Sequence, residues 1–141
     1  MPTRSSTAQW SGNLAGGNGS MSLGSGAFEG SYSYSSRFES GEGTNPEDLI
    51  AAVHAGSFLM ALANHLSQDG HEPDSVSTTA EVHLDKDDGG FSITRSDLTT
   101  EVKVEDMSDD EFQKHAEEAK EVCPVSRALG AIEIGLEAKL V

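Results

Sequence analysis

The stretch TNPEDLIAAVHAGSFLMALANHLSQDG, residues 44–70, decides the fold. Its opening supplies N-cap candidates, a proline suited to the first helical turn, and two carboxylates, Glu47 and Asp48, that favour the positive end of a helix dipole. The remainder is apolar nearly all round and rich in alanine, which indicates a helix buried on most faces. Gly70 is a natural helix stop. We therefore predict a long central helix over residues 44–69.

The segment before this helix, residues 1–43, is dense in glycine and serine and holds nine of the fifteen glycines. A flexible linker is one interpretation of such a composition. The regular spacing of the glycine-rich turns and the interspersed aromatic residues favour short strands instead. We predict these strands at residues 8–14, 20–24 and 27–35.

The segment after the central helix continues with strands and a second helical region. Alternating residues over 76–104, interrupted by an Asp-Asp-Gly-Gly turn, predict an antiparallel hairpin. A Ser-x-x-Glu capping box opens a helical region over 108–130, which Pro124 divides. We predict that one face of this region is apolar, formed by Phe112, Ala116, Ala119 and Cys123. Clean alternation over 131–141 predicts a terminal strand. The order predicts one α+β domain over 1–141, with a mainly antiparallel sheet of about six strands packed on the central helix.

The charge and the apolar segments argue against nucleic-acid and membrane partners and against secretion. The formal net charge is −15, from 24 acidic residues against nine basic ones, so nucleic acid and anionic membrane surfaces are disfavoured as partners. The longest apolar run, Leu49 to Ala63, is too short to span a bilayer and contains His54. No signal peptide is visible, and the single cysteine, Cys123, excludes an intrachain disulfide. We therefore predict a cytoplasmic protein without a cofactor.

Four short motifs carry the chemistry of the chain. They are Ser-Arg-Phe-Glu at 36–39, Thr-Asn-Pro-Glu at 44–47, His-Ala-Gly-Ser-Phe at 54–58 and Cys-Pro at 123–124. Together, in this order and at this spacing, they resemble the OsmC/Ohr family of thiol-dependent hydroperoxide reductases. The resemblance spans the whole chain, and the first and third motifs look like the OsmC branch.

The resemblance implies a two-cysteine peroxidase that forms an intertwined homodimer, with each site built from both chains. In that family a reactive cysteine, at the position of Ser57, attacks a hydroperoxide and becomes a sulfenic acid. A second cysteine, matching Cys123, then forms a disulfide with it. Arg37 matches the arginine that activates the thiolate, and Glu47 matches the carboxylate that orients the arginine. The implied substrates are organic hydroperoxides and, more weakly, hydrogen peroxide, with a lipoyl protein or a small dithiol as reductant.

The chain departs from this pattern at the reactive position itself, because Ser57 has no sulfur. A hydroxyl without a strong base stays protonated and forms no sulfenate, so we predict that peroxidase turnover is lost. One explanation is a deliberate Cys→Ser change; the other is a natural non-catalytic member with a structural role or a small apolar ligand. The retention of Arg37, Glu47 and Cys123 favours the first explanation, since these residues have little purpose without the sulfur.

Other interpretations of the same residues exist. Arg37 and Glu47 could form a surface ion pair, and Ser57 and Cys123 could be packing residues. His54 shares a helix face with Ser57, but the chain has no nucleophile elbow for a serine hydrolase, so we interpret His54 as a core histidine with a hydrogen-bond partner. The five histidines are scattered without ligand spacing, and no metal site is predicted.

Overall fold

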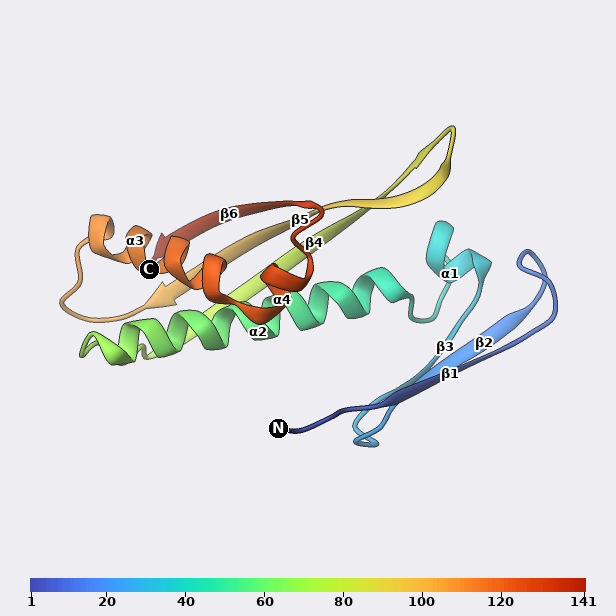
Figure 1. Cartoon of the computed structure of the whole chain (residues 1–141), viewed down its shortest axis with the longest axis horizontal. Coiled ribbons are helices and arrows are strands. Elements are labelled where there is room, and N and C mark those ends of the chain that lie inside the picture. The colour runs from blue at the N-terminus through green and yellow to red at the C-terminus, as the bar shows by residue number, and fades with distance from the viewer. The chain divides into compact units, whose positions relative to one another are not determined.

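The computed structural model describes all 141 residues of the chain. The elements in chain order are β1 (Ser6–Ser11), β2 (Asn18–Leu23), β3 (Glu29–Tyr32), α1 (Tyr34–Phe38), α2 (Pro46–Gln68), β4 (Ser75–Asp87), β5 (Gly90–Lys103), α3 (Asp109–Val122), α4 (Pro124–Ala128) and β6 (Glu133–Leu140) (Figure 1). The predicted α+β class is confirmed. The six strands form two sheets of three, β1-β2-β3 and β4-β5-β6, and not one sheet of six. The chain divides into two compact units, Met1–Leu49 and Ile50–Val141.

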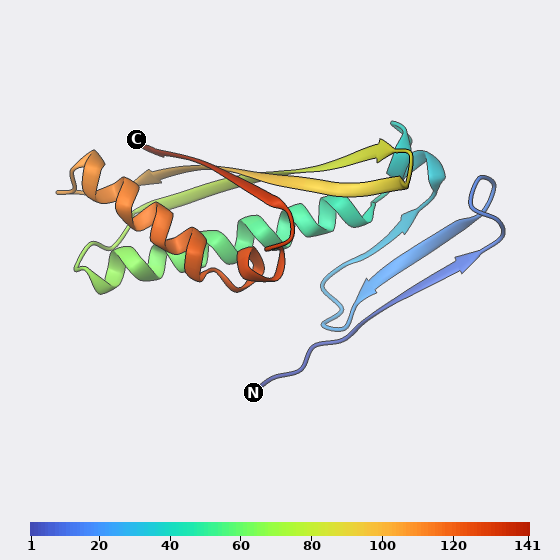
Figure 2. The ribbon, with the colours of Figure 1, turned by 45° about the horizontal axis from the view of Figure 1, so that its top comes forward.

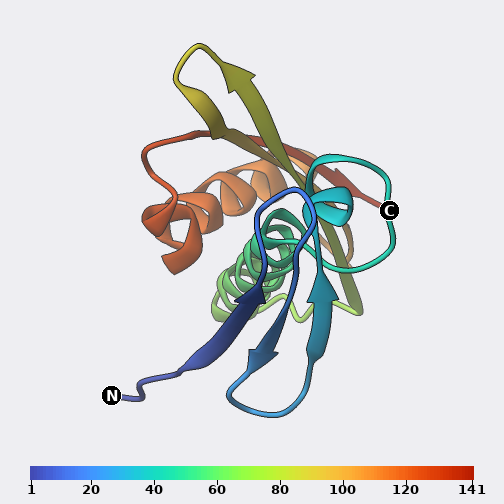
Figure 3. The same cartoon turned by 90° about the vertical axis from the view of Figure 1, so that its right-hand side faces the viewer.

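The first unit contains the sheet of β1, β2 and β3, all antiparallel and side by side in Figure 3. Every residue of β1 is exposed, and no apolar side chain in this unit is buried. The edge-to-face contact of Trp10 with Tyr32, at a ring-centroid distance of 5.3 Å, is one of its few aromatic contacts. A three-stranded sheet without a buried face lacks the packing that normally stabilises such a sheet.

The predicted third strand continues to residue 35, and this prediction is wrong at its end. The chain turns at Ser33 into the short helix α1. Ser33 Oγ accepts a hydrogen bond from the Ser36 backbone N–H at 3.2 Å, and Ser36 Oγ accepts one from the Ser33 N–H at 2.9 Å. This reciprocal cap satisfies two backbone donors and so begins a helix where the local composition alone indicates a strand.

The central helix α2 begins and ends within two residues of its predicted bounds. Asn45 caps it, since its side-chain oxygen accepts a hydrogen bond from the Asp48 N–H at 2.7 Å. Gly70, with φ of 86°, follows its end in the left-handed conformation that glycine tolerates best. The helix therefore forms where the sequence places it, because its start and stop signals are local.

The prediction that α2 is buried on most faces is wrong for the single chain. Phe58, Leu62 and Leu66 are fully buried on one face, whereas Val53 is 53% and Met60 71% exposed. Within the second unit only the β4-β5-β6 sheet and the short helices pack against α2, so only one of its faces is covered there. By length and composition α2 is also long and apolar enough to cross a membrane, contrary to the prediction, although its buried face packs in a core.

In the second unit, helices α2, α3 and α4 lie on one face of the β4-β5-β6 sheet (Figure 2). β4 and β5 form the predicted antiparallel hairpin, but β6 runs parallel to β5, pairing with residues 95–102. The pairings are thus mainly antiparallel, as predicted, and only that of β5 with β6 departs from the prediction. The physical reason is that α3 and α4 form the long crossover that a parallel connection requires.

The core of this unit lies between the sheet and the helices. The face of α3 predicted to be apolar is confirmed, since Phe112, Ala116 and Ala119 are fully buried, as is Cys123 just beyond it. Leu98 and Val102 of β5 meet them from the sheet. The core therefore packs directly against the residue that precedes α4.

Candidate active site

The structure brings Ser57 and Cys123 together, although 66 residues separate them in the chain. Ser57 lies at mid-length on α2 and is half-buried. Cys123 lies at the junction of α3 and α4, fully buried, and its thiol donates a hydrogen bond to Ser57 Oγ at 3.3 Å. The two positions are therefore in direct contact within one chain.

The surroundings of Cys123 act on its acidity in two opposing ways. Burial raises the pKa of the thiol, because a thiolate loses hydration there. Once the proton has left, the thiolate accepts hydrogen bonds from the Ser57 hydroxyl and from the backbone N–H of Ser126; these outweigh burial, so the pKa of Cys123 lies below its ordinary value. Sγ is 3.5 Å from the Ser126 nitrogen, in the N-cap position of α4. The thiol is thus placed where a thiolate is stabilised.

His54 is a fully buried histidine with two hydrogen-bond partners, as predicted. Its Nδ1 is 2.7 Å from Ser96 Oγ, and its Nε2 is 2.8 Å from Ser126 Oγ. Neither nitrogen is bonded to Ser57, so the Ser/His dyad has no support in this geometry. Through its hydrogen bond with Ser126, His54 instead stabilises the turn in which Cys123 lies. Ser96 and Ser126 carry no local motif, so the sequence does not predict either contact.

The buried position of His54 makes folding sensitive to pH. Desolvation lowers the pKa of His54 in the folded chain, whereas in the unfolded chain the imidazole takes up a proton below about pH 6.5. The stabilisation is therefore complete above that pH and is lost as the pH falls below it. We expect the free energy of unfolding, measured with urea from pH 8 to pH 5, to fall more steeply in the natural chain than in His54→Leu. Equal slopes would contradict the assignment.

Arg37 and Glu47 form a forked ion pair in the first unit. Arg37 Nη2 donates to Glu47 Oε1 at 2.8 Å and Nε donates to Oε1 and Oε2 at 3.2 and 3.3 Å. The Glu47 side chain is only 10% exposed and that of Arg37 34%, so this is more than a loose surface pair. The guanidinium also lies 5.2 Å from the centroid of the Phe38 ring.

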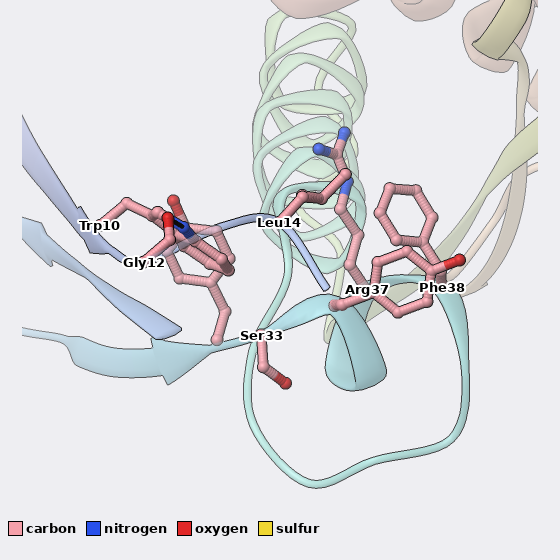
Figure 4. Close-up of a pocket in the computed structure, with 8 residues that line it drawn as sticks. Trp10, Gly12, Leu14, Ser33, Arg37 and Phe38 are labelled. Carbon is pink, nitrogen blue, oxygen red and sulfur yellow. Dashed lines mark hydrogen bonds between the residues drawn. The ribbon is translucent and has the colours of Figure 1, made fainter. Parts of the chain in front are cut away.

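Two cavities accompany these residues, one in each unit. Arg37 and Phe38 of α1 line the first, of about 400 Å³, with Trp10 on the strand side (Figure 4). The second, of about 370 Å³, is lined by Ser57, Met60, Ala61, Asn64, His65, Val122 and Pro124. Its mixed apolar and polar wall suits a small organic molecule with one polar end.

Two of the histidines, which have no ligand spacing in the sequence, are brought close together by the fold. His65 on α2 and His115 on α3 have ring centroids 6.3 Å apart. Glu118 lies beside them, three residues after His115 on the same helix. The His-x-x-Glu spacing on α3 is a signal available in the sequence, but the approach of His65 is not.

The fold and this geometry define a class of protein. It is an α+β chain in which a thiol at the start of a short helix faces a side chain in the middle of the long central helix. The model of the OsmC-like protein family matches residues 39–137. The chain is 44% identical to peroxiredoxin OsmC of Escherichia coli (strain K12) over 134 residues, which are 94% of this chain and 93% of that one. The chain therefore belongs to the OsmC-like protein family.

Relatives from the other branch are also similar. The organic hydroperoxide resistance protein OhrB of Bacillus subtilis (strain 168) is 35% identical over 99 residues, covering 69% of this chain and 71% of that protein. The crystal structure of OhrB of Bacillus subtilis superposes with a TM-score of 0.71 at 28% identity, covering 95% of this chain and 97% of that one. The fold is thus that of the OsmC and Ohr proteins.

Proposed function

We propose that this chain is the serine-substituted form of a thiol-dependent peroxidase that reduces organic hydroperoxides and, more weakly, hydrogen peroxide. The observation that carries the proposal is the 3.3 Å contact between Cys123 Sγ and Ser57 Oγ, in a chain 44% identical to a protein named peroxiredoxin OsmC. Serine and cysteine are nearly isosteric. A sulfur at position 57 would therefore need only a small movement to reach the bond length of a disulfide, about 2.05 Å.

The reaction assigns one role to each of these two positions. A thiolate at position 57 attacks one oxygen of the hydroperoxide, the O–O bond breaks, and the leaving alkoxide takes a proton to become the alcohol. The thiolate of Cys123 attacks the sulfur of the resulting sulfenic acid and forms a disulfide, and the displaced hydroxide takes a proton to become water. Two thiols of an external reductant, a lipoyl protein or a small dithiol, then restore both sulfurs. Ser57 cannot begin this sequence, because it has no thiolate to offer.

Arg37 and Glu47 are the residues we assign to activation of the thiolate. A guanidinium beside position 57 would favour the thiolate over the thiol, and the forked contact with Glu47 fixes the orientation of the guanidinium. We further propose an intertwined homodimer, in which each site draws on both chains. Two observations support it: the first unit buries no apolar side chain of its own, and α2 leaves Val53 and Met60 exposed.

The test of the function is consumption of cumene hydroperoxide in the presence of dithiothreitol, by the chain with Ser57 and by Ser57→Cys side by side. Consumption by Ser57→Cys alone supports the proposal. No turnover by a folded Ser57→Cys protein would overturn it, and turnover by the chain with Ser57 would assign the chemistry to another group.

The role of Arg37 is tested in the Ser57→Cys background. Lysine keeps the charge but cannot make the forked contact with Glu47, so we expect Arg37→Lys to lower kcat/KM for cumene hydroperoxide by about 10- to 100-fold. The matched control is Arg95→Lys, because Arg95 makes the same kind of forked contact with Asp97 on β5. If both substitutions have equal effects, Arg37 has no special part in activation.

The alternative is a natural, non-catalytic member of the family that binds a small apolar ligand or has a structural role. The serine itself and the cavity of about 370 Å³ beside it favour this alternative. The encoding gene separates the two: a native cysteine codon at position 57 marks the serine as engineered, and a native serine codon favours the non-catalytic protein. For either form we propose a cytoplasmic location, where a free thiol such as Cys123 persists.

A further inference from the structure

A second cluster of chemically competent side chains lies at the C-terminal part of α2, where it meets α3. His65, His115 and Glu118 each offer one ligand atom, and these atoms lie within 4.8 Å of one another. His65 Nδ1 is 3.7 Å from a carboxylate oxygen of Glu118. His115 and Glu118 are three residues apart on α3 and therefore share a face of that helix. None of the three has a role in the proposed peroxidase chemistry, although His65 also lines the cavity beside Ser57.

The ring of His115 is held in one orientation and leaves one nitrogen without a partner. Its Nε2 is 3.1 Å from Asp69 Oδ2, while its Nδ1 is buried and has no hydrogen-bond partner. A carboxylate only accepts hydrogen bonds, so in the neutral ring Nε2 donates to Asp69 and Nδ1 presents a lone pair. A buried lone pair without a donor is costly and is rare in folded proteins.

We propose that His65, His115 and Glu118 form a binding site for a divalent transition-metal cation, with Zn²⁺ preferred. Two imidazole nitrogens and one carboxylate oxygen are a donor set that zinc takes in proteins. Asp69 would accept a hydrogen bond from Nε2–H of His115. Metal-binding histidines usually donate their other N–H to a carboxylate in this way. The Glu118 side chain is 43% exposed, so water has access to the remaining coordination position.

The chemistry of the ligands also selects against other cations. Mg²⁺ and Ca²⁺ prefer sites made of oxygen atoms, and this site offers one carboxylate. Imidazole ligands favour Zn²⁺, Cu²⁺ and Ni²⁺. A bound cation would join the end of α2 to α3, the helix that leads directly to Cys123. Occupancy would therefore stabilise the helix pair that carries both positions of the proposed peroxidase site.

The experiment is calorimetric titration of Zn²⁺ into the natural chain after removal of metals with a chelator. We expect one equivalent to bind per chain, with no heat from Mg²⁺. His65→Ala, His115→Ala and Glu118→Gln should each weaken binding by about 100-fold or more, since each removes a ligand. Asp69→Asn should weaken it by about 10- to 100-fold, the usual effect of losing an outer partner of a metal-bound histidine.

Two controls make the result specific. His83→Ala should bind Zn²⁺ like the natural chain, because His83 is also paired with a carboxylate, that of Asp97, but has no second histidine beside it. Cys123→Ser should also bind normally, which excludes the thiol as the ligand. Circular dichroism establishes that each variant is folded, and the visible spectrum of Co²⁺ gives a second readout of tetrahedral coordination.

Three outcomes would overturn the inference. The first is the absence of binding by the natural chain at micromolar Zn²⁺. The second is binding that survives all three ligand substitutions. The third is loss of binding in His71→Ala but not in His115→Ala, because His71 lies with Asp69 and Glu111 in a neighbouring group. None of these measurements involves a hydroperoxide, so the peroxidase proposal stands or fails separately.

Discussion

In protein carrying Ser57→Cys, one equivalent of organic hydroperoxide is expected to convert both thiols of the chain into a disulfide within a single turnover. The chain with Ser57 has one cysteine, so its thiol count should stay at one. Cys123 Sγ already lies 3.3 Å from the side-chain oxygen at position 57, so the resolving step needs little rearrangement. The rate of peroxide consumption should exceed that of the natural chain by a thousandfold or more, on the order of what loss of a nucleophile costs other enzymes.

The measurement is a count of free thiols with a chromogenic disulfide in denaturant, before and after the peroxide is added without reductant. The matched variant is the double substitution Ser57→Cys with Cys123→Ala. It should react once and stop as a sulfenic acid, detectable with dimedone, because no second thiol can displace the hydroxyl group. A disulfide in the single variant that links two chains, instead of positions 57 and 123, would contradict the geometry described for the site.

His54→Ala is expected to cost about 3–5 kcal/mol of folding free energy, a large share of the stability of an ordinary domain. The substitution leaves a cavity at a fully buried site and removes the partners of two buried hydroxyls, those of Ser96 and Ser126. A buried polar group without a partner costs about 1–3 kcal/mol in itself. Urea denaturation at pH 7.5, where His54 is neutral in both states, measures the loss directly.

Two further variants separate the effect of the lost side-chain volume from that of the lost hydrogen bonds. His54→Leu fills most of the volume but makes no hydrogen bond, so about half of the loss should remain. His83→Ala removes a histidine whose side chain is 41% exposed and should cost about 1 kcal/mol or less. A loss below about 1 kcal/mol in His54→Ala would mean that the hydroxyls find other partners, and that His54 does not brace the turn at Cys123.

The sequence by itself determined the elements whose signals are local. The Asn45 cap and Gly70 bound α2, and the spacing of Phe112, Ala116 and Ala119 gave the buried face of α3. Such signals act within a few residues, because a cap or a helical face is satisfied by near neighbours. The motifs that resemble the OsmC/Ohr family likewise lie in short stretches, which is why the family could be predicted before the structure was known.

Only the tertiary structure decided the contacts between distant residues. The partners of His54 are 42 and 72 residues away, and the approach of His65 to His115 crosses from one helix to another. The parallel pairing of β6 depends on the crossover through α3 and α4, and the division of the strands into two sheets is a pairing of distant segments. No local pattern encodes these arrangements, because each is fixed by packing of the whole unit, where the burial of apolar faces selects one set of neighbours among many.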